Sequence, residues 1–507
     1  MLRKIVSVGG WTLLSRLTGF VRDVALAALI GAGPVMDAFA VAQRLPNHFR
    51  AIFGEGAFNA AFIPTYAQAR ERDGGAARLF ASRIWTLMIL VQLALLAAAI
   101  ALMPAIVRTL APGFADDPVR FDLAVTLTRI TFPYLLLITL VTILSALLNA
   151  HDRFAAAAAA PILLNVSIVA ALAAAVLFPG AGHAAAWGVF MAGVLELGLL
   201  WAAARRARVA PGLARPRLDP TMRGFFKTFG PAVIGSAGVQ IALFADTIIA
   251  SFLPRGAVSA LYYADRIAQL PIGVVGIAAG TVLLPEMARR IAGGDVAGAH
   301  AAQNRAVGFT LALALPCAVA FVAVPDLIMR ALFARGAFTA EDARAAGAVL
   351  SAYAVGLPAV VLIRSMLASF HARSDTTTPL YASLAAVAVN VALKIVLTGP
   401  LGAPGLALAT AVGAWVNVGL LAGLAWRRSW TAPSGALVRT AMAALIACVA
   451  LGVAVTAARN PLANAIAGLP GWRDEILLGA LAGLGALAYA GTLVAAARIL
   501  GVRLARR

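Results

Sequence analysis

The stretch FASRIWTLMILVQLALLAAAIALMPAI (80–106) decides the class of fold, because it holds no charged residue after Arg83. A run of about 20 apolar residues is long enough to cross the hydrocarbon core of a bilayer as an α-helix. Runs of this kind recur along the 507-residue chain, which is 62% hydrophobic and only 12% charged. A water-soluble globule of this size would need more polar residues to cover its surface. The sequence therefore predicts a protein whose main solvent is lipid.

About fourteen such runs can be placed, and their lengths predict membrane-spanning helices rather than the alternating strands of about ten residues that build a barrel. Arg16 and Arg22 interrupt the apolar part of the first run, which argues against a cleaved signal peptide. The fold class we expect is an all-α polytopic membrane protein. The expected spans are 7–31, 35–66, 80–106, 123–150, 157–178, 183–204, 225–253, 260–288, 304–332, 345–371, 377–398, 403–426, 437–457 and 476–500.

The formal net charge of +20 is spread over the ends of these spans and does not form a basic domain. Connections on one side of the membrane hold many more arginines and lysines than those on the other, which is the positive-inside pattern. This distribution predicts a multi-pass protein of the bacterial inner membrane with both termini in the cytoplasm, and it gives no support to nucleic-acid binding. Cys317 and Cys448 lie far apart within apolar spans and predict no metal or redox site.

The stretch ARRARVAPGLARPRLDPTMR (204–223) is the longest polar interruption, and its prolines keep it from continuing a helix. Features on either side of it recur at a constant spacing, since Pro285 follows Pro64 by 221 residues and Arg330 follows Arg108 by 222. We therefore expect two six-helix lobes in a parallel repeat, with the substrate site between them. The expected parts are an N-terminal lobe (1–210), a cytoplasmic linker (211–223), a C-terminal lobe (224–430) and two additional helices (431–507).

Charged side chains inside the spans are the candidate site, because an ionised group near the bilayer centre needs a partner or a water-filled cavity. Asp37 and Arg44 are seven residues apart and share a helix face, as do Arg16 and Asp23. Arginines outnumber the available carboxylates, and an unpaired guanidinium is suited to hold phosphate oxygens in a bidentate manner. The candidate anion site consists of Arg16, Arg22, Arg44, Arg50, Arg266 and Asp37.

The alternative is that such charges form internal salt bridges that hold helices together, or that arginines near the ends of spans extend toward the membrane surface. It applies best to Asp23, Asp265 and Glu55, each of which has an arginine nearby in the sequence. Three further embedded charges have no role that the sequence assigns, namely Arg129, Glu196 and Arg364.

Two other embedded charges, Asp246 and Lys394, are each alone on their spans, with Asn390 one helical turn before Lys394. The simplest expectation is a pair between the aspartate and the lysine, either structural or part of a conformational cycle.

The chain lacks a GxxxxGK[ST] phosphate loop, an HExxH motif and any loop longer than about twenty residues. We therefore expect a transporter and not an enzyme, with no cofactor and no bound metal. A membrane glycosyltransferase would need metal-binding carboxylates in sizeable loops. An exporter of cationic drugs would need an acidic cavity, whereas the candidate site is basic.

Several stretches resemble the MviN/MurJ family of lipid II flippases, which belongs to the multidrug/oligosaccharidyl-lipid/polysaccharide exporter superfamily. The resemblance covers essentially the whole chain and is most specific in the first two spans. The matching stretches are SRLTGFVRD (15–23), MDAFAVAQRLPNHFRAIFGEGAFNAAFIPTYA (36–67), APGF (111–114), ITFPYLLLI (130–138), LYYADRIAQLPIGVVGIAAGTVLLP (261–285) and RGAFTAEDA (335–343).

This resemblance implies a V-shaped cavity between two lobes and export of lipid II, the undecaprenyl-pyrophosphate-linked peptidoglycan precursor, to the periplasmic leaflet by alternating access. Another lipid-linked oligosaccharide, or a drug or ion in antiport, is the alternative cargo. The implied partners are lipid II and the membrane lipids; we expect a monomer, with the cell-wall synthesis machinery as a candidate contact. The family's cavity arginines fall on Arg16, Arg22, Arg50 and Arg266, and its cavity acid on Asp37.

The resemblance also implies roles for the C-terminal helices and for the lone charges. The spans at 437–457 and 476–500 match helices that line a hydrophobic groove for the polyprenyl tail. Some members carry a sodium site on the seventh and eleventh helices, which Asp246 and Asn390 fit, but Lys394 stands where those members have an acid. A fixed ammonium could substitute for the ion, which puts sodium coupling in doubt.

Overall fold

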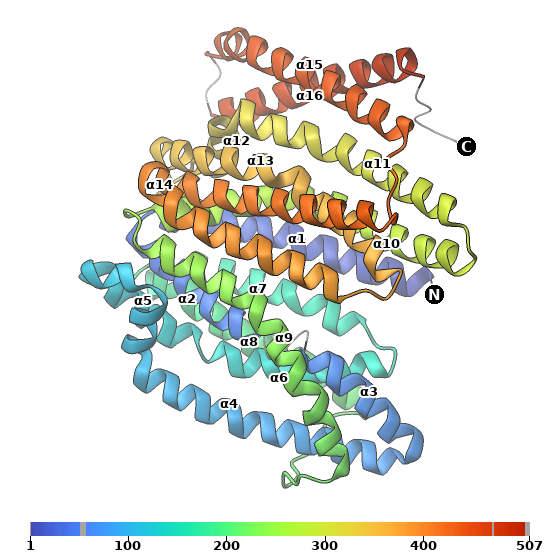
Figure 1. Cartoon of the computed structure of the whole chain (residues 1–507). Helices are drawn as coiled ribbons and strands as arrows, with labels where there is room; N and C mark the ends of the chain where they lie inside the picture. The colour runs from blue at the N-terminus through green and yellow to red at the C-terminus, as the bar shows by residue number, and fades with distance from the viewer. Residues whose placement is uncertain (1, 51–56, 469–470, 502–507) are drawn as a thin grey trace. The chain divides into compact units, whose positions relative to one another are not determined.

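The computed structural model describes residues 2–50, 57–468 and 471–501. Within these ranges the regular elements are all helical, and no strand occurs, which confirms the predicted all-α class (Figure 1). The α-helices are α1 (Leu2–Ile30), α2 (Pro34–Arg50), α3 (Ala57–Arg72), α4 (Gly74–Leu110), α5 (Pro118–Thr131), α6 (Tyr134–Ala150), α7 (Ala155–Ala173), α8 (Ala181–Arg206), α9 (Pro220–Ser251), α10 (Ala257–Ala292), α11 (Val296–Ala323), α12 (Pro325–Phe333), α13 (Ala340–His371), α14 (Thr377–Arg427), α15 (Gly435–Ala465) and α16 (Arg473–Ile499), with short 3-10 turns η2 (Pro112–Asp116) and η3 (Ala175–Leu177).

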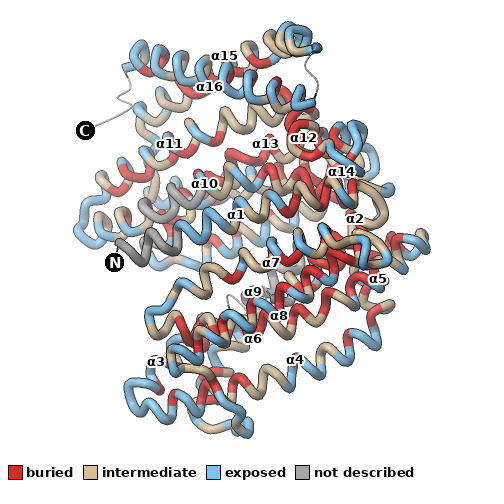
Figure 2. Tube along the Cα trace, turned by 180° about the vertical axis from the view of Figure 1, so that it is seen from behind, coloured by how far each residue is buried: buried red, intermediate tan, exposed pale blue. Residues whose placement is uncertain are grey.

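Nine helical segments of the described chain are long and apolar enough to span a bilayer. Most of their apolar windows have a small buried share, such as 22% in α4 and 17% in α16, although it reaches 72% in Pro118–Ala150 and 61% in α13. Figure 2 shows this exposure as pale blue along α15 and α16. Apolar helices that expose so much of their surface are stable in lipid and not in water. The chain is therefore a multi-pass membrane protein.

Some predicted spans are interrupted by a break in the helix, and elsewhere two predicted spans form a single helical segment. The expected span 123–150 is divided at Phe132 and Pro133, because a proline has no N–H for the helical ladder. Conversely, α14 covers two expected spans, which Gly402 separates with a non-helical backbone (φ 61°, ψ −137°). The total of about fourteen spans stays a prediction.

Packing divides the chain into two compact units, which we call unit 1 (Met1–Val258 with Arg335–Phe338) and unit 2 (Ser259–Ala334 with Thr339–Arg507). In unit 1, α1 packs on α7, α2 on α5, and α8 on both α6 and α7. In unit 2, α13 packs on α11 and α14, and α15 packs on α11 and α16. The lobe boundaries that the repeat suggests, with a linker at 211–223, stay a prediction.

The chain between α8 and α9 lies along the start of α4 in unit 1. The backbone N–H of Gly212 donates to Ser82 Oγ at 3.0 Å, and that of Ala214 donates to Thr86 Oγ1, also at 3.0 Å. Arg83 of the same helix forms an ion pair with Asp219, which caps α9. This connection is therefore held by specific contacts and is not a free tether.

Aromatic side chains join α9 to the N-terminal half of unit 1. Phe58 of α3 contacts Phe225 of α9 with ring centroids 6.0 Å apart, and Phe80 of α4 lies at the same distance from Phe225. Phe225 also stacks on Phe229 at 5.2 Å. Such aromatic contacts add to the free energy of burial, so α9 packs with the helices that precede it.

Candidate anion site and its supporting contacts

The two described arginines of the candidate site on α1 have different surroundings. The Arg16 side chain is exposed and forms no ion pair with any described residue. Arg22 is only 8% exposed, and its Nε and Nη2 donate to Asp23 Oδ1 at 3.0 and 2.7 Å. The salt-bridge alternative considered for Asp23 is therefore realised, with Arg22 as its partner.

Asn165 of α7 fixes the Arg22 guanidinium from the other side. Its Oδ1 accepts a hydrogen bond from Arg22 Nη1 at 3.0 Å. Its Nδ2 donates to the Ser15 carbonyl at 2.9 Å and to Thr18 Oγ1 at 3.1 Å. The sequence reasoning missed Asn165, although a buried asparagine within an apolar span is a polar group that needs partners.

Asp37 lies at the first turn of α2 and is fully buried. Its Oδ2 accepts a hydrogen bond from the backbone N–H of Gly256 at 2.8 Å and lies 3.7 Å from Arg120 Nη1. Arg120, at the start of α5, also donates to Asp117 at 2.9 Å and to the Leu253 carbonyl at 3.1 Å. Asp37 thus joins the start of α2 to α5 and to the connection between α9 and α10.

Asp117 completes this arrangement, which we call the Asp37 cluster (Asp37, Asp117, Arg120 and Arg255). Arg255 donates to both oxygens of Asp117, at 2.7 and 2.9 Å. The hydrogen bond from Arg255, with further help from the Arg120 backbone N–H, lowers the pKa of Asp117 to about 2. Asp117 therefore stays ionised at any physiological pH and holds both arginines.

Close backbone approaches lie near the same end of unit 1. At Gly336 a Cβ atom would lie 2.2 Å from the Ala28 carbonyl oxygen, and Ala337 N–H donates to that oxygen at 2.8 Å. At Gly113 a Cβ atom would lie 2.5 Å from the Ser251 carbonyl oxygen. Glycine is required at both positions because any side chain would collide with backbone.

Among the remaining candidate arginines, the structure describes the side chains of Arg44 and Arg266 but not that of Arg50. Arg44 is half-buried on α2 and forms no ion pair within the described part of the chain. Arg266 is half-buried on α10, with its guanidinium 4.8 Å from the centre of the Tyr262 ring. The Arg50 side chain and Glu55 lie outside the described residues. Because Arg266 belongs to unit 2 and the others to unit 1, a shared cavity stays a prediction.

The lone charges also lie in different units. Asp246 is half-buried on α9 of unit 1, whereas Lys394 is 1% exposed on α14 of unit 2. Asn390 Oδ1 is buried without a hydrogen-bond partner among the described residues. Their pairing therefore stays a prediction.

Of the embedded charges without an assigned role, Glu196 is buried and accepts a hydrogen bond from the Tyr134 hydroxyl at 3.3 Å, while Arg129 and Arg364 are exposed. No group of three or more His, Cys, Asp or Glu residues that could hold a metal ion occurs in the described ranges.

These features define a polytopic helical membrane protein with several charged groups inside its spans. A family model described as lipid II flippase MurJ matches residues 26–465. A probable lipid II flippase MurJ of Rhizobium meliloti is 45% identical over 92% of this chain and 89% of that protein. The lipid II flippase MurJ of Burkholderia cenocepacia is 33% identical over 83% of each chain. The chain belongs to the lipid II flippase MurJ family.

Solved structures support the same fold. A lipid II flippase MurJ in an inward closed conformation superposes with a TM-score of 0.82 at 24% identity, covering 98% of this chain and 99% of that one. An inward-facing MATE family multidrug transporter of the MOP superfamily gives a TM-score of 0.67 at 14% identity, covering 84% and 97%. The solved structures confirm the fold, whereas the family model and the relatives confirm the predicted family and, with it, the prediction of a transporter.

Proposed function

We propose that this chain moves lipid II from the cytoplasmic to the periplasmic leaflet of the inner membrane, and that its embedded arginines bind the pyrophosphate. The observation that carries this proposal is that Arg16 and Arg44 have no carboxylate partner among the described residues, in a chain whose residues 26–465 match the flippase family model. A guanidinium remains charged whatever its surroundings, and its planar fork matches phosphate oxygens. Arg50 and Arg266 complete the proposed set.

Arg22 has a dual role in this proposal. Three of its N–H groups donate to Asp23 and Asn165. Because both partners fix the guanidinium, an anion that approaches it meets a side chain that is already oriented, at little cost in side-chain entropy. Arg22 therefore holds α1 against α7 and, in this proposal, presents an oriented cation to the pyrophosphate.

Alternating access requires contacts that form in one state and break in the other. The Asp37 cluster is suited to this role because it joins the start of α2 and α5 to Leu253, Arg255 and Gly256. Packing places all of these residues in unit 1, whereas the repeat would assign those three to the second lobe. We propose that this cluster closes the periplasmic end and separates when lipid II is released there.

The test is complementation in cells depleted of the native flippase, with measurement of the leaflet in which lipid II accumulates. Arg16→Ala and Arg44→Ala are expected to leave lipid II in the cytoplasmic leaflet, and Arg16→Lys is expected to restore transport only in part. Arg206→Ala, which removes an exposed arginine at the end of α8, is the control and should complement fully. Normal transport by both alanine variants would contradict pyrophosphate binding by these arginines, although the chain would still belong to the flippase family.

A further inference from the structure

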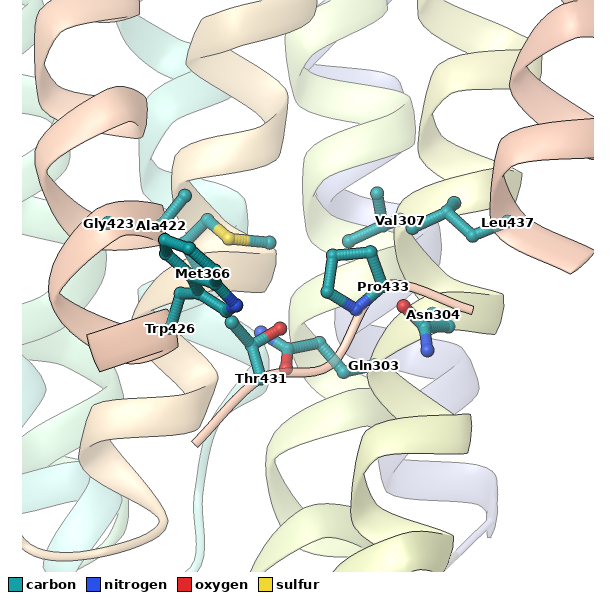
Figure 3. A pocket seen from close by; sticks show the side chains of 10 residues that line it. All are labelled: Gln303, Asn304, Val307, Met366, Ala422, Gly423, Trp426, Thr431, Pro433 and Leu437. Carbon is teal, nitrogen blue, oxygen red and sulfur yellow. The ribbon is translucent and has the colours of Figure 1, made fainter. Parts of the chain in front are cut away.

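A pocket in unit 2 is lined by none of the residues of the candidate anion site. It is formed by α11, α13, the end of α14, the following connection and the start of α15 (Figure 3). Its cavity volume is about 370 Å³. That volume is within the range of sites for small molecules. The lining residues are Gln303, Asn304, Val307, Met366, Ala422, Gly423, Trp426, Thr431, Pro433 and Leu437. We call this space the Gln303 pocket.

Gln303 distinguishes this pocket from an ordinary packing defect. Its side chain is 1% exposed, yet neither its Nε2 nor its Oε1 has a hydrogen-bond partner among the described residues. Figure 3 shows the side chain reaching from α11 into the space bordered by Met366, Trp426 and Pro433. The neighbouring Asn304, by contrast, donates to the Ala432 carbonyl at 2.8 Å. A buried amide without partners is unfavourable, so a ligand that supplies them would be stabilised.

The ligand must fit a mainly apolar space at the level where a membrane meets water. Trp426 is 69% exposed and is followed by Arg427 and Arg428, a sequence typical of the membrane–water boundary. Gln303 lies seven residues into α11, roughly 10 Å from its start. Because the pocket lining contains no charged residue, the part of a ligand that enters it must be uncharged.

Charges next to the pocket indicate the rest of the ligand. Arg427 follows Gly423 by one helical turn and therefore lies on the same face of α14. Its side chain is exposed and forms no ion pair with a described residue, whereas Arg428 is bound to Asp375 at 2.7 Å. A basic residue beside an apolar pocket between membrane helices is typical of sites for lipid head groups.

We infer that the Gln303 pocket binds the glycerol-ester region of an anionic phospholipid. An ester carbonyl accepts a hydrogen bond from Gln303 Nε2, and one acyl chain lies against Val307, Met366 and Leu437. The phosphate lies toward Arg427. The pocket lining contains none of the arginines proposed to bind the pyrophosphate, and the inference does not depend on the transport activity.

The test uses the full chain in nanodiscs with a phosphatidylglycerol that carries a photoreactive diazirine near the ester end of one acyl chain. Irradiation is expected to label peptides that contain Met366 or Leu437. Gly423→Leu fills the pocket, and no atom within 4 Å opposes a Cβ atom there. The matched control is Gly419→Leu, one turn earlier on α14, where a Cβ atom also meets open space outside the pocket lining.

Gln303→Leu and Gly423→Leu are each expected to lower the labelling of these peptides about tenfold, the loss of one good hydrogen bond or of the space itself. Gly419→Leu should leave labelling unchanged. Arg427→Gln should reduce competition by unlabelled phosphatidylglycerol until it equals that of phosphatidylethanolamine. Thermal melting of each variant verifies the fold. Wild-type labelling in both pocket variants, or equal competition by the two lipids in the unmodified protein, would overturn the inference.

Discussion

The carboxylate of Asp37 should contribute more to stability than its position beside an apolar span suggests, and Asp37→Ala tests this. A hydrogen bond to a charged acceptor contributes about 1.5–3 kcal/mol, and Asp37 accepts one from Gly256 N–H at 2.8 Å. The contact with Arg120 is longer, at 3.7 Å, and Arg120 retains Asp117 and the Leu253 carbonyl. The full penalty for breaking a buried pair therefore does not apply, and we expect a loss of about 3 kcal/mol in the free energy of unfolding.

Two companion variants separate the hydrogen bond from the charge. Asp37→Asn retains an oxygen for Gly256 N–H and should cost about 1 kcal/mol, since only the charge is lost. Arg120→Met removes the Arg120 cation beside the fully buried Asp37, together with the hydrogen bonds of Arg120 to Asp117 and the Leu253 carbonyl, and should cost about 3–5 kcal/mol. Because the two residues are in contact, the double variant Asp37→Asn/Arg120→Met should cost less than the sum of the single effects.

The assay is unfolding of the purified protein by SDS titration in mixed micelles, followed by tryptophan fluorescence. Asp122→Asn is the control, since Asp122 is an exposed residue of α5, the helix of Arg120, and has no ion pair with a described residue; its effect should lie within about 0.5 kcal/mol. A loss below about 1 kcal/mol for Asp37→Ala, or additive effects in the double variant, would refute the reasoning.

Three further predictions concern pH, topology and the lone charges. Because the pKa of Asp117 is depressed to about 2, the stability difference between the wild type and Asp117→Asn should be constant above about pH 4 and disappear as the pH falls through about 2. A cysteine in place of Arg255, whose side chain is 58% exposed, should react with an impermeant thiol reagent in intact cells; one in place of Arg215 should not, and its labelling would contradict the orientation. Asp246→Asn and Lys394→Ala should each reduce transport more than the double variant, and transport should not depend on external sodium; additive effects or sodium dependence would contradict a coupled pair.

The class of fold could be predicted from the sequence because a membrane span requires only a long apolar run, which is a local property. The division of the chain into two compact units could not be predicted from the sequence in the same way. The unit boundary follows Val258, and α9 packs with earlier helices through Phe225, which contacts Phe58 and Phe80. Those three phenylalanines are far apart in sequence, and no periodic pattern indicates that they meet.

The site shows the same distinction at the level of single residues. The surplus of arginines over carboxylates was visible in the sequence, and Arg16 and Arg44 indeed have no ion-pair partner among the described residues. The helical spacing did not indicate that Arg22 would turn toward Asp23, since adjacent residues point about 100° apart and only the length of the arginine side chain allows the contact. Helical spacing determines where the Cβ atom of a residue lies. It does not determine which partner the end of a long side chain contacts.

The other contacts that could not be predicted from the sequence are made by backbone groups. The partner of Asp37 is the N–H of Gly256, and a backbone donor is present at almost every residue, so it carries no sequence signal. Gly113 and Gly336 are required because backbone from another segment approaches where a side chain would begin. Both glycines lie in stretches that carried the family resemblance, as does Asp37. The stretches of this chain that carry the resemblance therefore combine charged residues with glycines that allow backbones to meet, and only the charges show their chemistry before the structure is known.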